Sequence, residues 1–514
     1  MAKSLMLAID CGTQSIRGIL IDPTGQIIAK AKVEFEPYFS DLPGWAEQDP
    51  ELYWQGLIQA CQILKTEYPE EWARIIGVSV TTQRDTCVCL DKKGQVLRAA
   101  ILWLDQRHAE CKKPLPLWVQ LALSAVRMKD SMELVRKKSC ANWIKENQPQ
   151  LWEKTDKYLL LSGYFNYKLT GETVDSIAAQ IGHIPFDYKN KKWLSSRSFK
   201  WEVFGVERDK LPTLVDSGQI LGYISSAASE KTGIKKGLPV VSSGSDKGCE
   251  TLAVGCSNLE WASLSFGSTA TIQTTSDYYF EPLKFFPSYP AVIPGKYNPE
   301  VEIFRGYWMI SWFKQEFSTR EMIEAKKKGI LAEQLLNLRL KEVPAGSQGL
   351  FLQPYWGPGL KNPEAKGAII GFGDVHTRAH IYRSIIEGIN YALLDGLEKI
   401  EARSGQQIKK IAVSGGGSQS DVICQITANM FNRPVYRIQT YETSGLGAAI
   451  AGFVGLKLFR SFDQAIKNMV YYHKVFEAEP DHVKVYSRLY KRVYKKIYPR
   501  LQKLYREIKT IINY

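Results

Sequence analysis

One pattern occurs in both halves of the chain: an apolar run of strand length, a short polar turn that contains glycine, and a second apolar run. It occupies residues 5–21 in the first half and residues 261–274 in the second. Apolar runs that flank such a turn predict a β-hairpin. Helical periodicity and further strand-like runs lie between the hairpins, which favours an α/β fold over a helix bundle. The repetition predicts two lobes that each open with a hairpin, with a boundary near residues 250–260.

Other elements can be predicted from the same periodicities. We expect strands at residues 76–81, 86–90, 238–242 and 408–413, and helices at residues 50–66, 377–403 and about 419–431. In the longest of these helices Ile381, Ile385, Ile389 and Leu393 recur every fourth residue, as on one face of a helix, and Gly405 follows its end.

The composition is that of a folded protein of several domains. The 514 residues are 45% apolar and 23% charged, close to the average for soluble globular proteins. The longest uncharged apolar run, residues 445–456, is shorter than the roughly 20 residues of a membrane-spanning helix, and no secretory signal is recognisable at the start. The nine cysteines are scattered and form no C-x-x-C pair. We therefore expect a cytoplasmic protein without a membrane span.

The C-terminal segment holds most of the excess positive charge. The formal net charge is +14, and residues 481–514 contain ten basic and two acidic residues. Apolar residues recur there at three- and four-residue steps, which predicts a helix docked on the core, and Pro499 is expected to kink or split it. Its basic side is either a solvated surface or a contact for an anionic membrane or nucleic acid. Because the rest of the chain carries little excess charge, we expect no nucleic-acid partner.

Three polar glycine turns follow predicted strands, at residues 10–15, 267–269 and 414–418. Consecutive backbone N–H groups in such turns can hold an anion, and glycine lets phosphate oxygens approach. Each turn on its own is typical of an ordinary connection between two elements, whereas the three turns together favour a phosphate ligand. The chain contains neither a P-loop motif nor a G-x-G-x-x-G motif that opens a first βαβ unit, so a nucleotide would be held in another way.

Two aspartates stand where predicted strands end among small residues, Asp10 and Asp246. Such a carboxylate can bind Mg2+ through water or accept a proton from an attacking hydroxyl, the two tasks that phosphoryl transfer leaves to protein carboxylates. Each of them is also a common turn cap. The six histidines show no H-E-x-x-H spacing, and we expect no metal site built from them.

The sequence resembles the FGGY carbohydrate kinases, relatives of glycerol kinase and xylulokinase, over essentially its whole length. The motifs that carry the resemblance lie at residues 10–17, 44–50, 82–86, 101–107, 169–172, 244–246, 266–269, 371–387 and 414–418. They include the phosphate motif Asp10-Cys11-Gly12-Thr13 and the Gly244-Ser245-Asp246 segment of the catalytic base. The motifs are too many, and follow the order of the family too closely, to agree with it by chance.

The resemblance implies a duplicated actin-like (ribonuclease H-like) ATPase fold in the α/β class, with ATP in the cleft between two lobes. The expected domains are residues 1–252, with the sugar site, the first phosphate motif and the catalytic aspartate, and residues 253–514, with the second phosphate motif, the adenosine motif and the basic C-terminal helix. The implied activity transfers the γ-phosphoryl group of ATP, with Mg2+, to a primary hydroxyl of a small ketose or polyol. A homodimer is possible within this family.

Roles follow residue by residue from the same resemblance. Asp246 is expected to be the general base. The sugar is expected to contact Gln83, Arg84, Asp85, Trp103 and Asp246. The phosphates are expected to contact Gly12, Thr13, Gln14, Ser15 and Arg17 in the first half and Gly267, Ser268 and Thr269 in the second. The adenosine is expected at Gly416, Gly417 and Ser418, and Asp10 is the candidate for holding Mg2+ through water.

The substrate signals conflict. Gln83-Arg84-Asp85 is closer to the Q-R-E of glycerol kinases, whereas residues 102–105 are similar to the pentulose branch, so a pentulose such as xylulose or ribulose and glycerol or a tetritol all stay open. Arg84 and Asp85 would offer donors and acceptors to adjacent hydroxyls, although Asp85 is one methylene shorter than Glu. Gly163 removes a polar contact that family members often have, and Lys247, unusual after the base, is expected to face solvent.

Two other functions fit the same motifs. A non-catalytic sensor would bind ATP or sugar without turnover, and an actin-like nucleotidase would hydrolyse ATP without a sugar. The intact Asp10, Asp246 and glycine turns favour an enzyme over the sensor, and a nucleotidase has no use for the Arg84-Asp85 pair.

Overall fold

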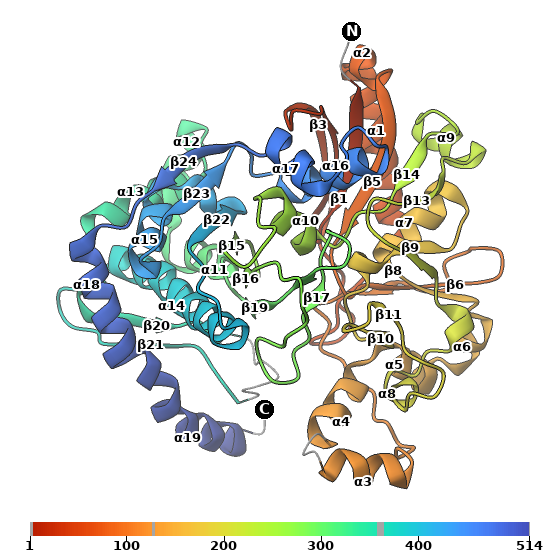
Figure 1. Ribbon diagram of the computed structural model, residues 1–514. Helices are drawn as coiled ribbons and strands as arrows, with labels where there is room; N and C mark the ends of the chain where they lie inside the picture. The colour runs from red at the N-terminus through yellow and green to blue at the C-terminus, as the bar shows by residue number, and fades with distance from the viewer. Residues whose placement is uncertain (1–3, 126–128, 357–363, 513–514) are drawn as a thin grey trace. The chain divides into compact units, whose positions relative to one another are not determined.

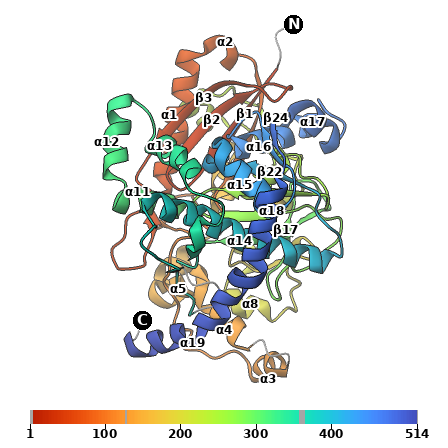
Figure 2. The same cartoon turned by 90° about the vertical axis from the view of Figure 1, so that its left-hand side faces the viewer.

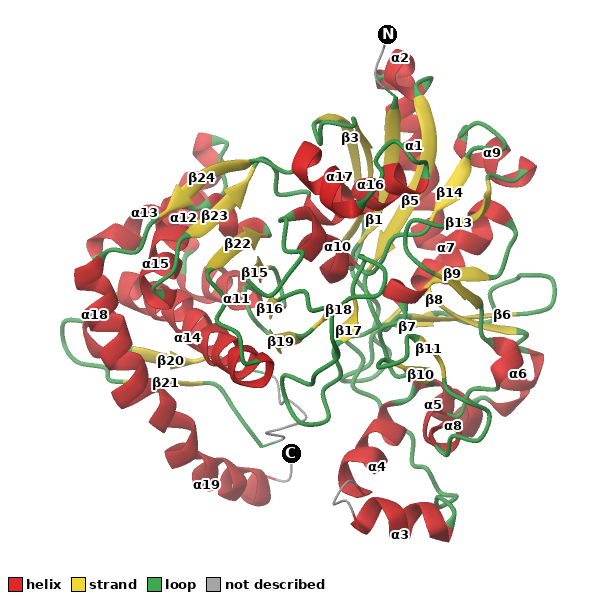
Figure 3. Cartoon of the chain, viewed as in Figure 1, coloured by secondary structure: helices red, strands yellow, loops and turns green. Residues whose placement is uncertain are grey.

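The computed structural model describes residues 4–125, 129–356 and 364–512. The chain divides into two compact units (Figure 1). Unit 1 comprises Met1–Ala253, Tyr289–Tyr297 and Ser444–Val470, and unit 2 comprises Val254–Ser288, Asn298–Thr443 and Tyr471–Tyr514. Each unit is built on one six-stranded sheet with helices packed against it, which confirms the predicted α/β class (Figure 3).

The sheet of unit 1 has the strand order β13-β14-β5-β1-β2-β3. Its strands are β1 (Leu5–Cys11), β2 (Ser15–Ile21), β3 (Ile27–Glu34), β5 (Ile75–Thr82), β13 (Ile220–Tyr223) and β14 (Pro239–Val241). Strands β1, β2 and β3 form an antiparallel meander, β5 and β14 continue it in parallel with β1, and β13 closes the edge in antiparallel orientation. The predicted first hairpin is confirmed.

The sheet of unit 2 repeats this pairing pattern. Its order is β19-β16-β15-β22-β23-β24, with β15 (Trp261–Phe266), β16 (Ala270–Gln273), β19 (Glu300–Ile303), β22 (Lys410–Ser414), β23 (Val435–Ile438) and β24 (Tyr472–Phe476). β15 pairs with β16 and β16 with β19 in antiparallel orientation, β15, β22 and β23 run parallel, and β24 closes the edge in antiparallel orientation. The two units therefore share one topology, as a duplicated fold requires.

Smaller sheets and helices complete each unit. The other strands are β4 (Glu47–Gln48), β6 (Cys87–Leu90), β7 (Ala100–Ile101), β8 (Lys157–Leu160), β9 (Val174–Ser176), β10 (Phe186–Asp187), β11 (Lys192–Trp193), β12 (Thr213–Val215), β17 (Tyr289–Pro290), β18 (Tyr297–Asn298), β20 (Phe351–Gln353) and β21 (Ala368–Ile370). The helices before unit 2 begins are α1 (Pro50–Glu67), α2 (Pro69–Trp72), α3 (Leu117–Ala125), α4 (Lys129–Lys138), α5 (Cys140–Asn147), α6 (Pro149–Lys154), α7 (Leu161–Thr170), α8 (Lys200–Phe204), α9 (Ser226–Thr232) and α10 (Asp246–Ala253). The later helices are α11 (Trp308–Phe317), α12 (Thr319–Lys328), α13 (Ala332–Arg339), α14 (Arg378–Ser404), α15 (Asp421–Phe431), α16 (Thr443–Gly455), α17 (Phe462–Met469), α18 (Pro480–Leu489) and α19 (Lys495–Ile512).

The predicted long helices are confirmed within one or two residues at each end. α1 begins after Asp49, whose side chain accepts a hydrogen bond from the N–H of Glu51, with Pro50 in the first turn. α14 begins with a capping box between Thr377 and His380 and ends at Gly405, which has a φ of 68°. A residue other than glycine would be strained in that left-handed conformation. Among the residues described, no helix has the length and apolar character to cross a membrane.

The structure decides against one of the two outcomes predicted at Pro499, a split of the C-terminal helix. The chain does not split there, because Pro499 lies inside α19. The irregular turn comes earlier, where residues 490–494 widen into a π-helical turn between α18 and α19. In a regular helix the N–H of residue 499 would bond to the carbonyl of Lys495, so Pro499 removes one backbone bond near the start of α19, directly after the π-helical turn.

A buried network attaches α18 to α14, which lie side by side with α15 in unit 2 (Figure 2). Arg383 donates to Glu387 over 2.8 Å and to the hydroxyl of Tyr486 over 2.7 Å, and that hydroxyl donates to Glu387 over 2.7 Å. Ser347 donates to the second oxygen of Glu387 over 2.9 Å. Since both charges of the pair are buried, the network is stable only when every one of these groups is bonded.

We expect Tyr486→Phe to lower the free energy of unfolding by about 1–3 kcal/mol, because it leaves buried charged groups of Arg383 and Glu387 short of one bond. Urea unfolding of the purified variants measures the change. Tyr490→Phe is the matched control: its hydroxyl donates to Glu398, which also pairs with Lys495 and is 39% exposed. Equal stability of the Tyr486 variant and the wild type would contradict the role of the network.

Candidate active site

Three loops of unit 1 come together because their strands run parallel and adjacent. The loop at Gly12 follows β1, the loop at Arg84 follows β5, and Asp246 follows β14. The pairing continues past the strands, since Thr82 and Ser245 form a parallel bridge. The carboxyl ends of adjacent parallel strands are where α/β sheets bind ligands. The structure thus brings the predicted sugar residues, the predicted base and the first glycine turn to one edge of the sheet.

Asp246 is the first residue of α10, and its side chain is 27% exposed. Its carboxylate Oδ1 accepts a hydrogen bond from the N–H of Lys247 over 2.7 Å and lies 3.8 Å from Nε of Arg84. Burial raises the pKa of Asp246, and the charges of Lys247 and Arg84 lower it only in part, so the pKa stays above its ordinary value. A carboxylate in this setting is a stronger base than one in water.

Lys247 does not face solvent, contrary to the prediction. Its side chain is 15% exposed, and its ammonium pairs with Glu250 over 3.0 Å, one turn further along α10. The spacing of three residues places both side chains on one face of the helix. The inward ammonium does lower the pKa of Asp246, but Glu250 raises it and burial outweighs both cations.

Arg84 and Asp85 lie next to each other, yet their side chains contact different groups. Arg84 donates to the hydroxyl of Ser245 over 3.2 Å, and its guanidinium lies 5.1 Å from the ring centre of Tyr289. Asp85 accepts two hydrogen bonds from His183, over 2.9 Å from its backbone N–H and over 2.6 Å at Nδ1. The donor and the acceptor predicted for the sugar are thus each held in place by the protein.

Trp103, Thr13 and Gln83 form a chain of hydrogen bonds. The indole N–H of Trp103 donates to the hydroxyl of Thr13 over 3.0 Å, and this hydroxyl donates to Oε1 of Gln83 over 2.8 Å. Gln83 in turn donates to the hydroxyl of buried Tyr53 over 3.2 Å. A residue predicted for phosphate, Thr13, is therefore bonded to two residues predicted for the sugar.

The remaining residues of the first turn differ in accessibility. Gln14 is exposed, whereas Ser15 is buried at the start of β2, and the N–H of Gly12 donates to the carbonyl of Ser15 over 3.0 Å. Arg17 pairs with its cross-strand neighbour Asp10 over 2.9 Å. The turn is closed by its own backbone, and the charges beside it are a carboxylate and a guanidinium.

In unit 2, the turn of Gly267, Ser268 and Thr269 follows β15. Ser268 is exposed, Thr269 donates to the carbonyl of Phe304 over 3.1 Å, and the carbonyl of Gly267 accepts from the N–H of Tyr307 over 3.0 Å. The exposed Ser268 is therefore the hydroxyl of this turn that is most available to a ligand.

The second glycine turn of unit 2, at residues 415–418, follows β22, the parallel neighbour of β15. Gly416 is exposed with open space at its Cα, whereas a Cβ on Gly417 would lie 2.4 Å from the ring of Tyr307. Ser418 is buried, and its hydroxyl donates to the carbonyl of Gly415 over 2.7 Å. Gly416 and Gly417 thus form the accessible part of the predicted adenosine motif, and Ser418 shapes the turn from inside.

Metal ligands are sparse in the structure. Across residues 4–125, 129–356 and 364–512, no group of three or more histidine, cysteine, aspartate or glutamate side chains is placed to hold a metal ion. Asp10 offers carboxylate oxygens, the donors that Mg2+ prefers, and Mg2+ commonly keeps several waters instead of filling its shell with protein groups. One oxygen of Asp10 already pairs with Arg17, and a water-mediated Mg2+ at this carboxylate stays a prediction.

Gly163 leaves space for a buried carboxylate, that of Asp175 on β9. A Cβ on Gly163 would lie 3.3 Å from Oδ2 of Asp175. Asp175 accepts hydrogen bonds from the following residues: Ser162, Asn166, Gln180 and the N–H of Ser176. Burial raises the pKa of Asp175 to about 6. An aspartate at position 163 would place a second carboxylate beside it, so the carboxylate of this region comes from β9 and position 163 stays without a side chain.

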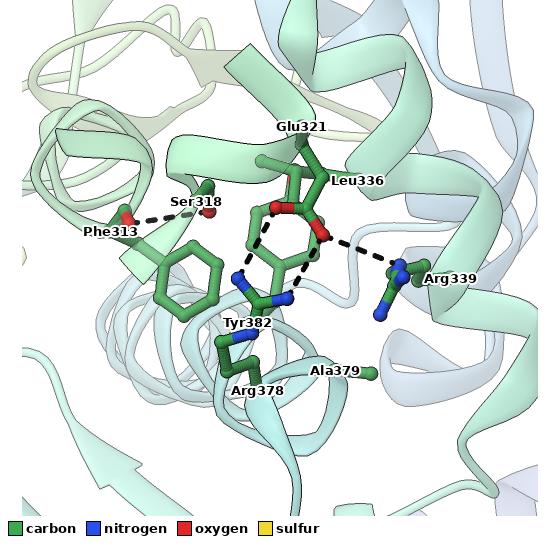
Figure 4. A pocket seen from close by; sticks show the side chains of 8 residues that line it. All are labelled: Phe313, Ser318, Glu321, Leu336, Arg339, Arg378, Ala379 and Tyr382. Atoms are coloured by element: carbon green, nitrogen blue, oxygen red, sulfur yellow. Dashed lines mark hydrogen bonds and ion pairs between the residues drawn. The ribbon is translucent and has the colours of Figure 1, made fainter. Parts of the chain in front are cut away.

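A pocket in unit 2 is lined by residues other than those predicted for the site (Figure 4). Its interior is about 10 Å³, close to the space that a single water needs. Glu321 projects into it and pairs with Arg378 over 3.3 Å and with Arg339 over 3.6 Å. One carboxylate thus pairs with two guanidinium groups, and the pocket is too small for a sugar or a nucleotide.

Sequence reasoning missed two residues beside the predicted sugar residues, His183 and Tyr289. Tyr289 lies about two hundred residues from Arg84 and precedes no recognisable motif. His183 could have been suspected from Gly182 before it, because a glycine next to a histidine permits a close approach, but nothing in the sequence indicates Asp85 as its partner.

Two family models match the chain. The model of the N-terminal domain of the FGGY family of carbohydrate kinases matches residues 5–253, and the model of the C-terminal domain matches residues 262–456. Xylulose kinase of Lactococcus lactis is 27% identical over 505 residues, which cover 94% of this chain and 94% of that protein.

Solved structures have the same fold. Xylulose kinase from Lactobacillus acidophilus matches with a TM-score of 0.82 at 20% identity, over 98% of this chain and 100% of that one. Gluconate kinase from the same bacterium matches with a TM-score of 0.82 at 20% identity, over 99% of this chain and 100% of that one. With the repeated sheet topology, these matches confirm the predicted duplicated actin-like fold.

Asp175 makes unit 1 sensitive to pH in a defined direction. Its pKa is about 6 in the folded chain against an ordinary 3.8, so the folded state retains a proton that the unfolded state releases. We therefore expect the contribution of this group to fall by about 3 kcal/mol as the pH rises from about 4 to 6. Urea unfolding at several pH values should show that the difference between Asp175→Asn and the wild type changes over this range. Exposed Asp463→Asn is the control, and a constant difference would contradict the prediction.

Proposed function

The chain belongs to the FGGY family of carbohydrate kinases, and from this premise we propose that it transfers the γ-phosphoryl group of ATP to a primary hydroxyl of a small ketose or polyol, with Asp246 as the general base. The observation that carries the proposal is the meeting of Asp246 and Arg84 at the carboxyl ends of β14 and β5, where Nε of Arg84 lies 3.8 Å from the carboxylate.

Asp246 is suited to accept the proton of the attacking hydroxyl. An ionised carboxylate only accepts hydrogen bonds, and its burial strengthens it as a base. Arg84 keeps this carboxylate ionised in the partly buried setting, and Ser245 holds the guanidinium in position over 3.2 Å. The substrate hydroxyl would bond to the carboxylate and lose its proton as its oxygen attacks phosphorus.

The first glycine turn and Arg17 are the groups of unit 1 that we assign to the phosphates of ATP. In unit 2 we assign Ser268 with its neighbours Gly267 and Thr269 to the phosphates, and Gly416 and Gly417 to the adenosine. Accessible glycines and backbone N–H groups suit these roles. Asp10 would hold Mg2+ through water, and the ion would neutralise charge that develops on the transferred group.

Xylulose is the first substrate to test, because the Lactococcus lactis relative is named for it. Asp85 and Arg84 resemble the glycerol kinase branch instead, so glycerol and tetritols belong to the same panel. The site offers a guanidinium, a carboxylate–imidazole pair and an indole within one loop cluster. These groups suit a short chain of adjacent hydroxyls on an apolar carbon skeleton.

ADP release with Mg-ATP tests the proposal against glycerol, erythritol, D- and L-xylulose and D- and L-ribulose. We expect one compound to stimulate release strongly. A slow ADP release that none of them changes would instead indicate a nucleotidase, and ATP binding without any release would indicate a sensor.

With the best compound of the panel, we expect Asp246→Asn to lower kcat by at least about a hundredfold, since the amide cannot take up the proton. Binding of ATP, measured by calorimetry, should change little. Asp91→Asn, in the turn after β6, is the matched control. A variant that keeps more than about a tenth of the wild-type rate would remove Asp246 from this role.

Lys247 and Glu250 on α10 should shift the acid limb of the pH profile of kcat/KM in opposite directions. That limb reports the pKa of the base in the free enzyme, and activity falls as Asp246 takes up a proton. Lys247 lowers the pKa of Asp246 and Glu250 raises it. We therefore expect the limb to move to higher pH in Lys247→Met and to lower pH in Glu250→Gln. Shifts in the same direction in both variants would contradict the assignment of the limb to Asp246.

A further inference from the structure

His183 lies against the residue predicted to bind the sugar, Asp85. Its backbone N–H donates to Oδ1 over 2.9 Å, and its ring Nδ1 lies 2.6 Å from Oδ2. An ionised carboxylate can only accept, so the proton of this second bond is on Nδ1. The pair is therefore a carboxylate that orients an imidazole.

The backbone around this pair is built for close contact. Asp85 is in the left-handed region with a φ of 46°, which is uncommon for a residue other than glycine. Its N–H donates to the carbonyl of Ile181 over 3.0 Å. A Cβ on Gly182 would lie 2.4 Å from Oδ1 of Asp85, so any side chain at position 182 would push the carboxylate away. Strained backbone of this kind is retained where the surrounding structure holds it, commonly at functional sites.

The same segment is tied to Arg84 through two tyrosines. The hydroxyl of Tyr188 donates to the carbonyl of Gly182 over 3.1 Å and accepts from its N–H over 3.2 Å. The ring of Tyr188 packs edge-on against Tyr289 at 5.5 Å, and Tyr289 lies under the guanidinium of Arg84. His183 and Arg84 are thus held on one loop cluster of unit 1, with Asp246 beside Arg84.

The other ring nitrogen of His183, Nε2, is available. Within the described part of the chain no group bonds to it, and the His183 side chain is 29% exposed. With the proton on Nδ1 of a neutral ring, Nε2 presents a lone pair. Arg84 can only donate, so a bound polyol needs acceptors for the protons of its hydroxyls. His183 already takes one lone pair on each oxygen of Asp85, and Nε2 of His183 adds a further acceptor beside them.

We propose that His183 is a substrate-contacting, specificity-determining residue of this kinase: its Nε2 accepts a hydrogen bond from a hydroxyl of the sugar or polyol that is not the one phosphorylated. Asp85 is then a positioning residue, which fixes the ring and its tautomer, and Gly182 permits the approach. The short side chain of Asp85 leaves the space that the imidazole occupies. This inference rests on the proposed function and deepens it.

A purely structural pair would hold the loop without touching the substrate, and kinetics separate the two roles. The test compares the wild type, His183→Ala and His183→Gln with the best compound of the panel and with its monodeoxy analogues. We expect His183→Ala to raise the KM for that compound about tenfold, the value of one neutral hydrogen bond, and to leave the KM for ATP unchanged. Glutamine offers an acceptor oxygen and should restore part of the affinity. Exposed His108→Ala is the control.

The deoxy analogues identify the contact. For one analogue, kcat/KM of the wild type should be about tenfold lower than for the parent compound. His183→Ala should show the same kcat/KM for that analogue and for the parent, because the variant has no acceptor to lose. Asp85→Asn should raise the KM in the wild-type background and add little in His183→Ala. An unchanged KM in His183→Ala, or a penalty for every deoxy analogue that persists in this variant, would overturn the inference while leaving the kinase assignment intact. Absence of any sugar-dependent ADP release from the wild type would overturn the proposed function and the inference together.

Discussion

Parallel pairing of β1 with β5 and of β5 with β14 is the constraint on which the site depends. The backbone hydrogen bonds of these strands fix their register, and the loops that follow must leave from the same edge. Residues separated by more than two hundred positions, from Asp10 to Asp246, therefore end up on one loop cluster. Unit 2 repeats the arrangement with β15, β22 and β23, and its two glycine turns leave the sheet in the same way.

The side chains on this edge are held by one another before any substrate arrives. Arg84 is fixed by Ser245 and Tyr289, and Asp85 by His183. Thr13 joins the first glycine turn to Gln83 and Trp103. Ordering these groups in advance lowers the entropy that binding would otherwise cost, and under the proposed function it would align the reacting hydroxyl with Asp246. The buried cations and carboxylates also balance locally, as in the Lys247–Glu250 pair on α10.

Helices and strands could be predicted where the sequence pattern involves residues close together in the chain. The hairpins follow from apolar runs and their turns, and α1 and α14 follow from caps and periodicity that lie within a few residues of each end. The prediction that Lys247 faces solvent was wrong, and the split allowed at Pro499 does not occur, for the opposite reason. Whether Lys247 points inward depends on Glu250 and on what covers α10, and the effect of Pro499 depends on where α19 begins. Neither the orientation of Lys247 nor the effect of Pro499 follows from the residue type alone.

The sequence by itself determined the α/β class, the two hairpins and the motifs that resemble those of a carbohydrate kinase, because these depend on residues close together in the chain. Only the tertiary structure decided the partners of the site residues. Arg84 and Asp85 are neighbours in sequence, yet one contacts Asp246 and the other His183, and Gly163 makes room for Asp175. Such contacts join segments about a dozen to some two hundred residues apart, and they form only when sheet pairing and burial bring the segments together.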